Sequence, residues 1–326
     1  MHILILTPHK NREKIDRYEA GESMLLALEE NKITWDYHAP WEKFEGDLGK
    51  YDAVLVWAYN GKKHNMIFWA TKFEAECEKL GIPVINSIKG CFYSHSYCYK
   101  KWNEANIPCP KYQNFQTPEE LDLKYPIILR VDDQHEAKNV FLAHNYEEAV
   151  SICKEQLEKY ISSEKSDKIT RPLDLAIEYQ DVRAEDGYYH KRRTIVIGDK
   201  LIRREHTISD NWIVNIGNRV ANEHSRLMNQ DFYENGDTDA DLVYRAAKAL
   251  DSDIVALDYT IKSDGEYIFW EGNKNFKMYG NKIFGKDDIN PATGRNYEQM
   301  RSLDLAVGRA LVDLIYKRVE NRAAAS

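Results

Sequence analysis

Short apolar runs alternate with longer amphipathic segments over the first part of the chain. The runs at His2–Leu6, Tyr51–Trp57 and Ile82–Asn86 are β-prone, and helices are expected over Tyr18–Glu30 and His64–Lys79. Strands that alternate with helices predict a parallel sheet covered by those helices, which is a small α/β domain. No GxGxxG pattern follows the first strand, so the sequence does not support a dinucleotide-binding fold.

The middle of the chain predicts a mixture of strands and helices. A helix over Ser96–Glu104 ends before Asn106-Ile-Pro-Cys-Pro110, because proline cannot continue a helix. The elements expected beyond it are strands at Tyr125–Val131, Val140–Ala143 and Leu175–Tyr179, a helix at Tyr146–Tyr160, and a hairpin over 192–204 that turns at Gly198-Asp199. This part of the chain therefore has the mixed pattern of an α+β fold.

Two helices are expected near the end of the chain. The acidic stretch Asn235–Asp241 precedes the first, and its spacing fits either a calcium loop or the start of a helix. Helix capping is favoured, because acidic side chains accept hydrogen bonds from the first turn and complement the helix dipole. The second helix predicts a core stripe with helical spacing, formed by Met300, Leu303, Val307, Leu311 and Leu314.

A late hairpin carries the clearest candidate chemistry. Ile254–Ile261 and Tyr267–Trp270 are β-prone runs joined by turn residues, so Asp258 is expected to lie opposite Glu271. Glu271 and Asn273 share one face, because side chains alternate along a strand. Two carboxylates and an amide oxygen are ligands that Mg²⁺ accepts, with phosphate oxygens and water completing its shell. The alternative is a hairpin with ordinary surface acids.

Composition narrows the classes of protein to consider. The chain has 326 residues, 43% of them hydrophobic and 30% charged, which predicts a globular protein of two or three lobes. A formal net charge of −8 argues against a nucleic-acid surface. No apolar run is long enough for a signal peptide or a membrane span, so neither is expected.

The cysteines favour reduced thiols and a cytoplasmic location. Their number is odd, no CxxC pair occurs, and no export signal is recognised. A zinc cluster of Cys91, Cys98, Cys109 and His95 matches no familiar zinc spacing. The five cysteines are Cys77, Cys91, Cys98, Cys109 and Cys153.

Several short segments between residues 82 and 280 stand in a characteristic order. They are Val84-Ile-Asn-Ser87, Asn106-Ile-Pro-Cys-Pro110, Pro126-Ile-Ile-Leu-Arg130, Ala176-Ile-Glu-Tyr179, Arg193-Thr-Ile-Val-Ile-Gly198, Trp212-Ile-Val-Asn215 with Gly217, and Asp258 with Glu271-Gly-Asn273. Together they resemble the ATP-grasp superfamily, and more closely its branch of glutathione synthetases and ribosomal-protein glutamate ligases. Each segment is short, and their specificity comes from their order and spacing.

The resemblance implies three structural parts and two cofactors. An N-terminal α/β domain with a small parallel sheet would span 1–90, the small lobe of an ATP-grasp domain 91–182, and its large lobe 183–326. ATP would lie between the two lobes with Mg²⁺ on its phosphates. The residues implied are His95, Arg130, Lys138, Glu178, Tyr179 and Asp181 for the nucleotide, Asp258, Glu271 and Asn273 for the metal, and Arg193 and Asn215 for catalysis. Tyr59, Asn60, Lys274 and Asn275 would help to orient the substrates.

Three departures from the family pattern concern phosphate binding. His95 stands where the family has a lysine, and Arg130 replaces a second lysine. The loop Asp132–Asn139 contains no glycine, although backbone that cradles phosphate needs room that a Cβ would fill. Either Lys138, His135 and Arg130 bind phosphate through their side chains, or nucleotide binding is weak or lost. Arg130 fits a bidentate phosphate contact or an ion pair equally well.

The resemblance implies an ATP-dependent carboxylate–amine ligase that forms an amide through an acyl phosphate. Arg193 would stabilise the acyl phosphate and the following tetrahedral oxyanion. The departures leave open a nucleotide-binding protein without ligase activity, and a phosphotransferase is a further alternative. Small molecules or short peptides bearing a carboxylate and an amine are the expected partners, with neither nucleic acid nor membrane, and a homo-oligomer is possible.

Overall fold

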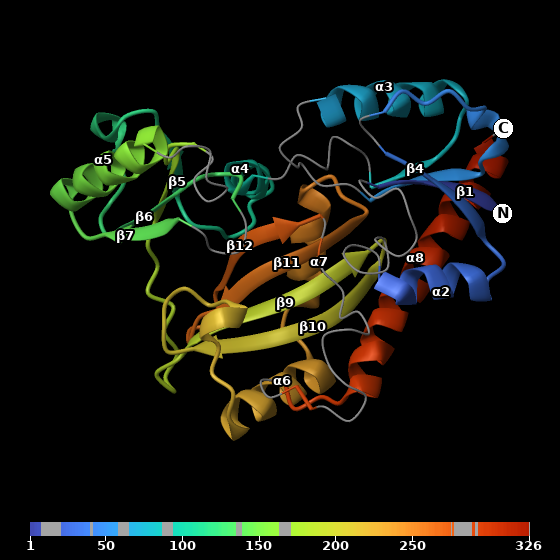
Figure 1. Cartoon of the computed structure of the whole chain (residues 1–326). Helices are drawn as coiled ribbons and strands as arrows, with labels where there is room; N and C mark the ends of the chain where they lie inside the picture. Colours follow the sequence, from blue (N-terminus) through green and yellow to red (C-terminus); the bar gives the residue numbers. More distant parts are fainter. Residues whose placement is uncertain are drawn as a thin grey trace.

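Three four-stranded sheets organise the protein, and each occupies a separate part of the chain (Figure 1). The fold mixes a parallel sheet with antiparallel sheets, as the sequence predicted. In the computed structural model the described residues are 1–7, 21–39, 42–57, 65–86, 94–134, 139–162, 171–274, 276, 289–290 and 293–325.

The first sheet is parallel, with strand order β2-β1-β3-β4. Three of its strands are where the sequence predicted them, whereas β2 was missed because its residues are largely polar and only half-buried at the sheet edge. Helix α3 packs on one face through Phe73 and Cys77, and α2 packs on the other through Met24 and Leu28. The elements are β1 (His2–Leu6), α2 (Gly21–Glu30), β2 (Thr34–His38), β3 (Ala53–Val56), α3 (Asn65–Lys79) and β4 (Val84–Ile85).

The second sheet forms a small antiparallel lobe with strand order β5-β8-β6-β7. Its core contains Ile127, Leu129, Ala149 and Ala176, which join the sheet to helix α5. Alternate residues on β6 are buried, as expected for a sheet with one covered face. The elements are α4 (His95–Glu104), β5 (Tyr112–Asn114), β6 (Ile127–Arg130), β7 (Val140–Ala143), α5 (Tyr146–Ser162) and β8 (Leu175–Glu178).

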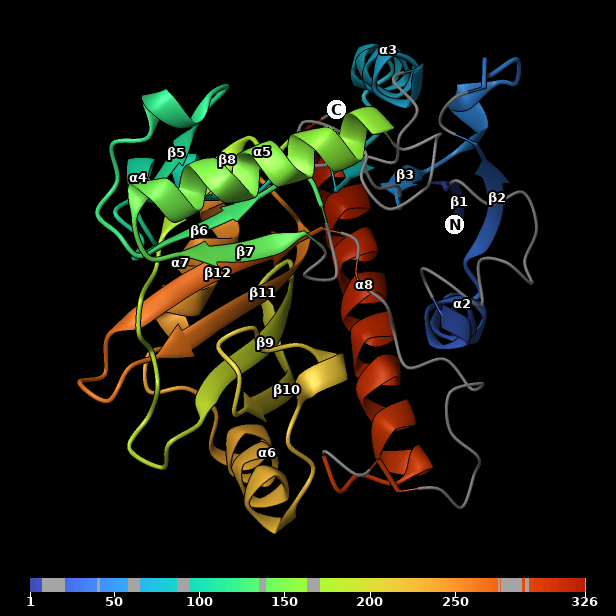
Figure 2. The ribbon, with the colours of Figure 1, turned by 60° about the vertical axis from the view of Figure 1, so that its left-hand side comes forward.

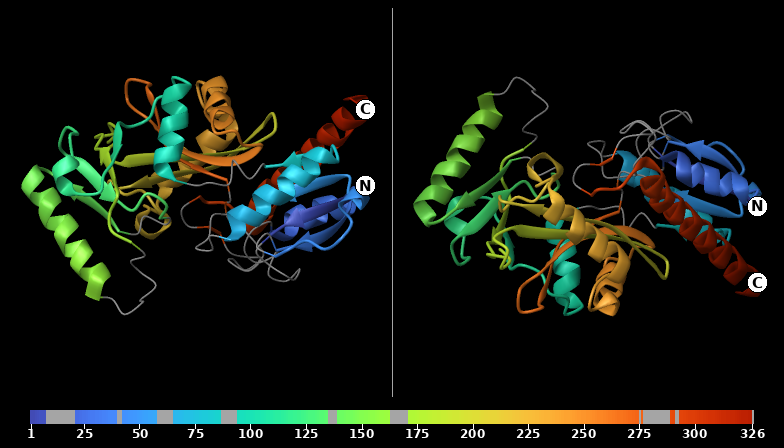
Figure 3. Two further views of the ribbon diagram at one scale, coloured as in Figure 1. Left: turned by 90° about the horizontal axis from the view of Figure 1, so that it is seen from above. Right: turned by 90° about the horizontal axis from the view of Figure 1, so that it is seen from below.

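The third sheet is antiparallel, with strand order β10-β9-β11-β12, and is the centre of the molecule (Figure 3). One face packs on α4 and α7 through Trp102, Val243, Leu257 and Phe269. Helix α6 lies along β10, and it was not predicted because few of its residues are apolar and buried. The elements are β9 (Tyr189–Ile197), β10 (Lys200–Ser209), α6 (Glu223–Asn235), α7 (Ala240–Ala249), β11 (Ile254–Ile261), β12 (Tyr267–Asn273) and α8 (Tyr297–Ala325).

The acidic stretch before α7 caps that helix. Asp239 is its N-cap, and its side chain accepts a hydrogen bond from Leu242 N at 2.8 Å. Asp237 instead pairs with Arg192 and with the hydroxyl of Tyr259. The structure therefore favours capping over calcium binding.

Helix α8 crosses the molecule between the first and third sheets (Figure 2). Its predicted apolar stripe is buried throughout, and Val307 and Leu311 share one core with Ile3 of β1 and Ile195 of β9. The three sheets lie within the predicted segments 1–90, 91–182 and 183–326, but α4 and α8 each contact neighbouring segments, and the domain boundaries stay predictions. Among the helices of the described residues, none is long and apolar enough to cross a membrane.

Gly308 allows α8 to approach α2 closely. A Cβ built at Gly308 would lie 2.7 Å from Ser23 O and 2.9 Å from Ala27 Cβ. One of these atoms belongs to the backbone of α2, so a side-chain rotation cannot relieve the contact. We expect Gly308→Ala to lower the free energy of unfolding by about 1–3 kcal/mol, even though alanine is about 1 kcal/mol better than glycine within a helix. Denaturant titration of the two proteins measures this difference.

Arg309→Ala is the matched control, because Arg309 is the next residue of α8 and is exposed. It should change the free energy of unfolding by less than about 0.5 kcal/mol. A Gly308→Ala protein more stable than the wild type would show that helix propensity dominates and that the two helices can separate freely.

Candidate functional site

A row of charged residues crosses the third sheet, with one residue on each strand. Glu205 of β10 pairs in register with Arg193 of β9, Arg193 with Asp258 of β11, and Asp258 with Glu271 of β12. Neighbours in register project from the same face of a sheet. The predicted pairing of Asp258 with Glu271 is confirmed, and the structure adds a base and a further acid to it.

The same face of the sheet is apolar beyond the charged row. Ile195 and Ile197 follow Arg193 along β9, and Ala256 and Ile254 precede Asp258 along β11. All four belong to the core that contains α8. The charged row therefore borders the core that α8 covers, with the carboxylates and Arg193 at the edge of this dry core.

Asp258 is buried and is neutralised by two cations. Arg193 binds it in bidentate fashion, with Nε to Oδ1 at 2.6 Å and Nη2 to Oδ2 at 2.7 Å. Lys191 Nζ lies 3.1 Å from the same Oδ2. Burial alone would raise the pKa of Asp258, but the charges of Arg193 and Lys191 lower it to about 2. Asp258 in turn raises the pKa of Arg193 against the effect of burial.

His95 joins this row to the small lobe. Its side chain is 3% exposed at the start of α4, and its Nε2 lies 3.9 Å from Glu271 Oε1. Its Nδ1 is 2.8 Å from the carbonyl oxygen of Asp132, so Nδ1 carries the proton. Burial, helped by the charge of Arg130, lowers the pKa of His95 to about 4. The imidazole is therefore neutral at pH 7, unlike the lysine that the resemblance implies at this position.

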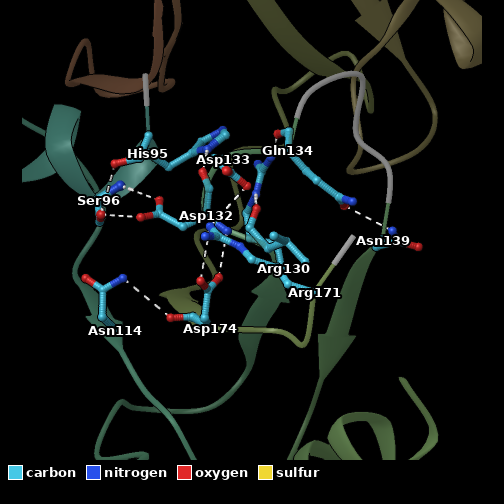
Figure 4. Close-up of polar contacts among 12 residues, drawn as sticks. His95, Ser96, Asn114, Arg130, Asp132, Asp133, Gln134, Asn139, Arg171 and Asp174 are labelled. Carbon is cyan, nitrogen blue, oxygen red and sulfur yellow. Dashed lines mark hydrogen bonds and ion pairs between the residues drawn. The ribbon is translucent and has the colours of Figure 1, made fainter. Parts of the chain in front are cut away.

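Asp132 fastens the start of the loop Asp132–Asn139 to the first turn of α4 (Figure 4). Its Oδ1 accepts a hydrogen bond from Ser96 N at 2.8 Å, and its Oδ2 accepts one from Ser96 Oγ. The backbone amide of His95 donates to Asp132 O at 3.2 Å. The N-terminus of a helix is a natural place for an anion, and here a protein carboxylate occupies it.

Two arginines hold the same segment from the other side (Figure 4). Arg171 Nη2 lies 3.0 Å from Asp133 Oδ1 and 3.1 Å from Asp174 Oδ2. Arg130 Nη2 donates to Gln134 O at 2.6 Å, so its guanidinium turns back onto the start of the loop. Burial raises the pKa of Asp174. The described part of the loop is thus fixed by ion pairs and carbonyl contacts, where the family pattern has glycine.

The proposed adenine strand uses its backbone amides within the small lobe. Glu178 N donates to Lys111 O at 2.9 Å, and Tyr179 N donates to Pro126 O at 3.0 Å. An adenine ring beside β8 would therefore have to bind other groups. The hydroxyl of Tyr179 lies 3.1 Å from that of Tyr189, which begins β9.

Asp181 is exposed and turns toward the backbone. Its Oδ1 accepts a hydrogen bond from Arg183 N at 3.2 Å, while Nη2 of the same arginine donates to Tyr189 at 2.9 Å. Tyr179, Arg183 and Tyr189 thus form a polar hinge cluster where the chain passes from the small lobe to the large one. A nucleotide contact for Asp181 stays a prediction.

Two of the expected site residues have structural partners, and a catalytic role for Asn215 stays a prediction. Asn215 caps a short 3-10 helix, and its Oδ1 accepts hydrogen bonds from Gly217 N and Asn218 N. The expectation that Lys274 orients a substrate is wrong, because Lys274 is buried and donates to Leu250 O at 2.7 Å. The sequence around Lys274 gave no signal of this inward turn. The expectations for Lys138, His135, Tyr59, Asn60 and Asn275 lie outside the described residues.

The donor chemistry of the row fits a hard cation. Asp258, Glu271 and Asn273 offer two carboxylates and a carboxamide, and their strand positions share one face. Both oxygens of Asp258 already contact cations, so the protein alone offers an incomplete set of ligands. Consistent with this, no three His, Cys, Asp or Glu residues gather closely enough to hold a metal anywhere in the described part of the chain. Phosphate oxygens would have to complete such a site.

Gly272 sets the position of β12 and therefore the direction in which the candidate metal ligands Glu271 and Asn273 point. A Cβ at Gly272 would lie 2.3 Å from Leu250 Cδ1 and 3.5 Å from Cys98 Sγ. The glycine lets β12 press against α4 and α7, while Glu271 and Asn273 face the other way. The sequence analysis missed Glu205, because regular pairing of the predicted hairpin puts Arg204 opposite Arg193, and only a β-bulge between Arg203 and Glu205 brings Glu205 there.

Comparison with solved structures identifies the fold. A RimK-domain ATP-grasp protein from Sphaerobacter thermophilus is similar over 97% of this chain and 100% of its own, with a TM-score of 0.54 and 14% identity. A D-alanine–D-alanine ligase from Bacillus anthracis, complexed with ATP, is similar over 100% of this chain and 99% of its own, with a TM-score of 0.57 and 13% identity. The chain has the ATP-grasp fold.

A third similar structure is the D-alanine–D-alanine ligase from Coxiella burnetii. The similarity extends over 100% of this chain and 97% of the Coxiella burnetii chain, with a TM-score of 0.55 and 10% identity. No family profile and no curated protein sequence matches the chain. The ATP-grasp fold is therefore evident in the structure, while the sequence has diverged far from the proteins compared. At this level of identity the likeness concerns the fold alone.

The low pKa of His95 predicts a pH-dependent stability. The unfolded chain takes up a proton near pH 6.5, whereas the folded protein resists until about pH 4. Stability should therefore fall as the pH drops through this window, by up to roughly 3 kcal/mol. His95→Asn keeps an amide that can donate to Asp132 O and should lose less stability. Urea unfolding at about pH 7 and about pH 4.5, with a chelator present, measures both proteins.

His206 contributes in the same direction in both proteins, because burial and Arg192 lower its pKa to about 3. The difference between wild type and His95→Asn therefore isolates His95. Equal losses of stability on acidification would show that His95 takes up its proton as readily in the folded protein as in the unfolded chain.

Proposed function

We propose that this protein is an ATP-dependent ligase that joins a carboxylate to an amine through an acyl phosphate. The observation that carries the proposal is the row Glu205, Arg193, Asp258 and Glu271, which faces the small lobe at His95. The similar structures support it, because they share the fold over nearly the whole chain and two are ligases that join amino acids. Small molecules or short peptides are the proposed substrates.

In the proposed reaction, a carboxylate oxygen of the substrate attacks the γ-phosphorus of ATP. The new C–O–P bond forms as the β,γ-anhydride bond breaks and ADP leaves. The amine nitrogen then attacks the acyl carbon, the C–O bond to phosphate breaks, and the ammonium proton is lost to solvent. Each step moves negative charge without redox change, so positioning and charge neutralisation are the main tasks of the protein.

The chain's own residues divide these tasks. Arg193 presents a planar fork at the centre of the row, where it would stabilise the phosphoryl oxygens and then the tetrahedral oxyanion. Asp258, Glu271 and Asn273 would hold Mg²⁺, which when bound neutralises phosphate charge and orients the leaving group. The apolar core under α8 excludes water beside the row, which strengthens these electrostatic interactions.

Nucleotide binding without ligation is the second candidate. It is favoured by the clasp of Asp132 on α4 and by the contact of Arg130 with Gln134, because both occupy groups that could bind phosphate. Isotope labelling separates the candidates. A ligase acting through an acyl phosphate transfers one ¹⁸O from a labelled carboxylate to the released phosphate. A phosphotransferase would leave the phosphate on the acid, and a binding protein would release none.

We expect Glu271→Gln to lower amide formation from MgATP by at least about a hundredfold. The substitution keeps the shape of the side chain and removes one anionic ligand. It is a cleaner test than Asp258→Asn, which would leave Arg193 and Lys191 without their buried counter-charge and endanger the fold. Phosphate release and mass spectrometry of the amide product, over a panel of acids and amines, provide the measurement.

Glu266→Gln is the matched control on the same hairpin. Glu266 is 53% exposed and pairs with Lys262 at the turn, away from the row. It should retain wild-type turnover. If Glu271→Gln also retained it, the row would not be the site of phosphoryl transfer, and the ligase proposal would be overturned.

A further inference from the structure

Lys191 lies on the face of β9 that carries Arg193, two residues closer to the hinge cluster. Its side chain is 22% exposed, against 2% for its partner Asp258. The ammonium group sits 3.1 Å from Oδ2, an oxygen that already accepts a hydrogen bond from Arg193 at 2.7 Å. Asp258 is thus in contact with two cations, although a single positive charge would balance its carboxylate.

The two cations hold Asp258 with different strength. Arg193 makes two parallel hydrogen bonds from a rigid fork, whereas Lys191 makes one longer contact from a flexible four-carbon stem. Any ion that takes Oδ2 displaces Lys191 more easily than Arg193. A displaced ammonium of this exposure can turn toward solvent beside the row.

Among the described residues of the small lobe, the groups expected to bind phosphate already have protein partners. His95 is buried with its Nδ1 at the carbonyl oxygen of Asp132, and Arg130 donates to the carbonyl oxygen of Gln134. In the described residues, the N-terminus of α4 is occupied by Asp132. ATP carries several negative charges, so cations from the large lobe become more important for holding it.

We propose that Lys191 is a phosphate-binding residue that changes partners. It holds Asp258 in the nucleotide-free protein and moves to the phosphates of ATP when Asp258 becomes a ligand of Mg²⁺. This inference rests on the proposed function, because it requires MgATP in the cleft. It adds a residue and a metal-dependent exchange of ion pairs to that function.

Calorimetric titration with adenosine 5′-(β,γ-imido)triphosphate tests the exchange. With Mg²⁺ present, Lys191→Met should weaken binding by about tenfold to a hundredfold, the effect of losing one charged hydrogen bond. With a chelator and no Mg²⁺, Asp258 keeps Lys191, so the substitution should change affinity by no more than about twofold. Lys191→Arg retains the positive charge and should recover much of the Mg²⁺-dependent affinity.

Lys200→Met is the matched control, because Lys200 is an exposed lysine on the same hairpin, at the far end of the strand pair. It should bind like the wild type in both conditions. If Lys191→Met weakens binding equally with and without Mg²⁺, the residue has only a structural role and the exchange is refuted. Unchanged or tighter binding with Mg²⁺ would make Lys191 merely a competitor of the metal. Failure of wild-type protein to bind the nucleotide would instead sink the proposed function itself.

Discussion

A buried carboxylate must be neutralised, and this requirement on Asp258 sets the arrangement of the large lobe. Arg193 and Lys191 can reach Asp258 only if β9 and β11 pair in the register observed. A slip of one residue would turn Arg193 toward the core of α4 and α7 and bring Thr194 or Arg192 beside Asp258, depending on its direction. The same register places Ile195 under α8. Apolar packing and charge pairing therefore specify the same alignment of the sheet. Any other register would lose both the ion pairs of Asp258 and the packing of Ile195 under α8.

The N-terminal domain is linked to the candidate site by two contacts. It packs against α8, and its Trp57 packs against Phe276, which follows β12. Phe276, three residues after Asn273, packs against Trp57 with ring centroids 5.9 Å apart. Trp57 follows β3 at the carboxyl end of the parallel sheet, the edge where α/β folds place ligands. The first sheet thus closes one side of the charged row, and the small lobe approaches from the other through His95. All three parts of the chain therefore contribute residues around the charged row.

Local pattern in the sequence was sufficient for elements with strong periodicity. The stripe from Met300 to Leu314 and the pairing of Asp258 with Glu271 follow from spacing alone, and the structure confirms both. Spacing could not show that Arg193 and Lys191 share Asp258, because that contact depends on how two hairpins dock. It also could not find β2 or α6, whose few buried residues lack a clear period. A polar residue with a structural partner, such as Lys274, looks in a sequence like a residue of a site.

The contacts of α4 explain why the loop Asp132–Asn139 begins with a side chain that binds the helix and contains no glycine. This helix is anchored to the large lobe by Trp102, whose Nε1 donates to Ala246 O at 2.9 Å, and to the small lobe by Asp132. A loop that must grip a helix needs side chains, whereas a loop that wraps phosphate needs bare backbone. In the described part of this loop, Asp132 grips the helix with its side chain. Asp132 thereby fills the anion position at the N-terminus of α4, and among the described residues Arg193 and Lys191 of β9 are the cations that contact Asp258. The structure thus places a carboxylate at the N-terminus of α4 and two cations beside Asp258 of the large lobe.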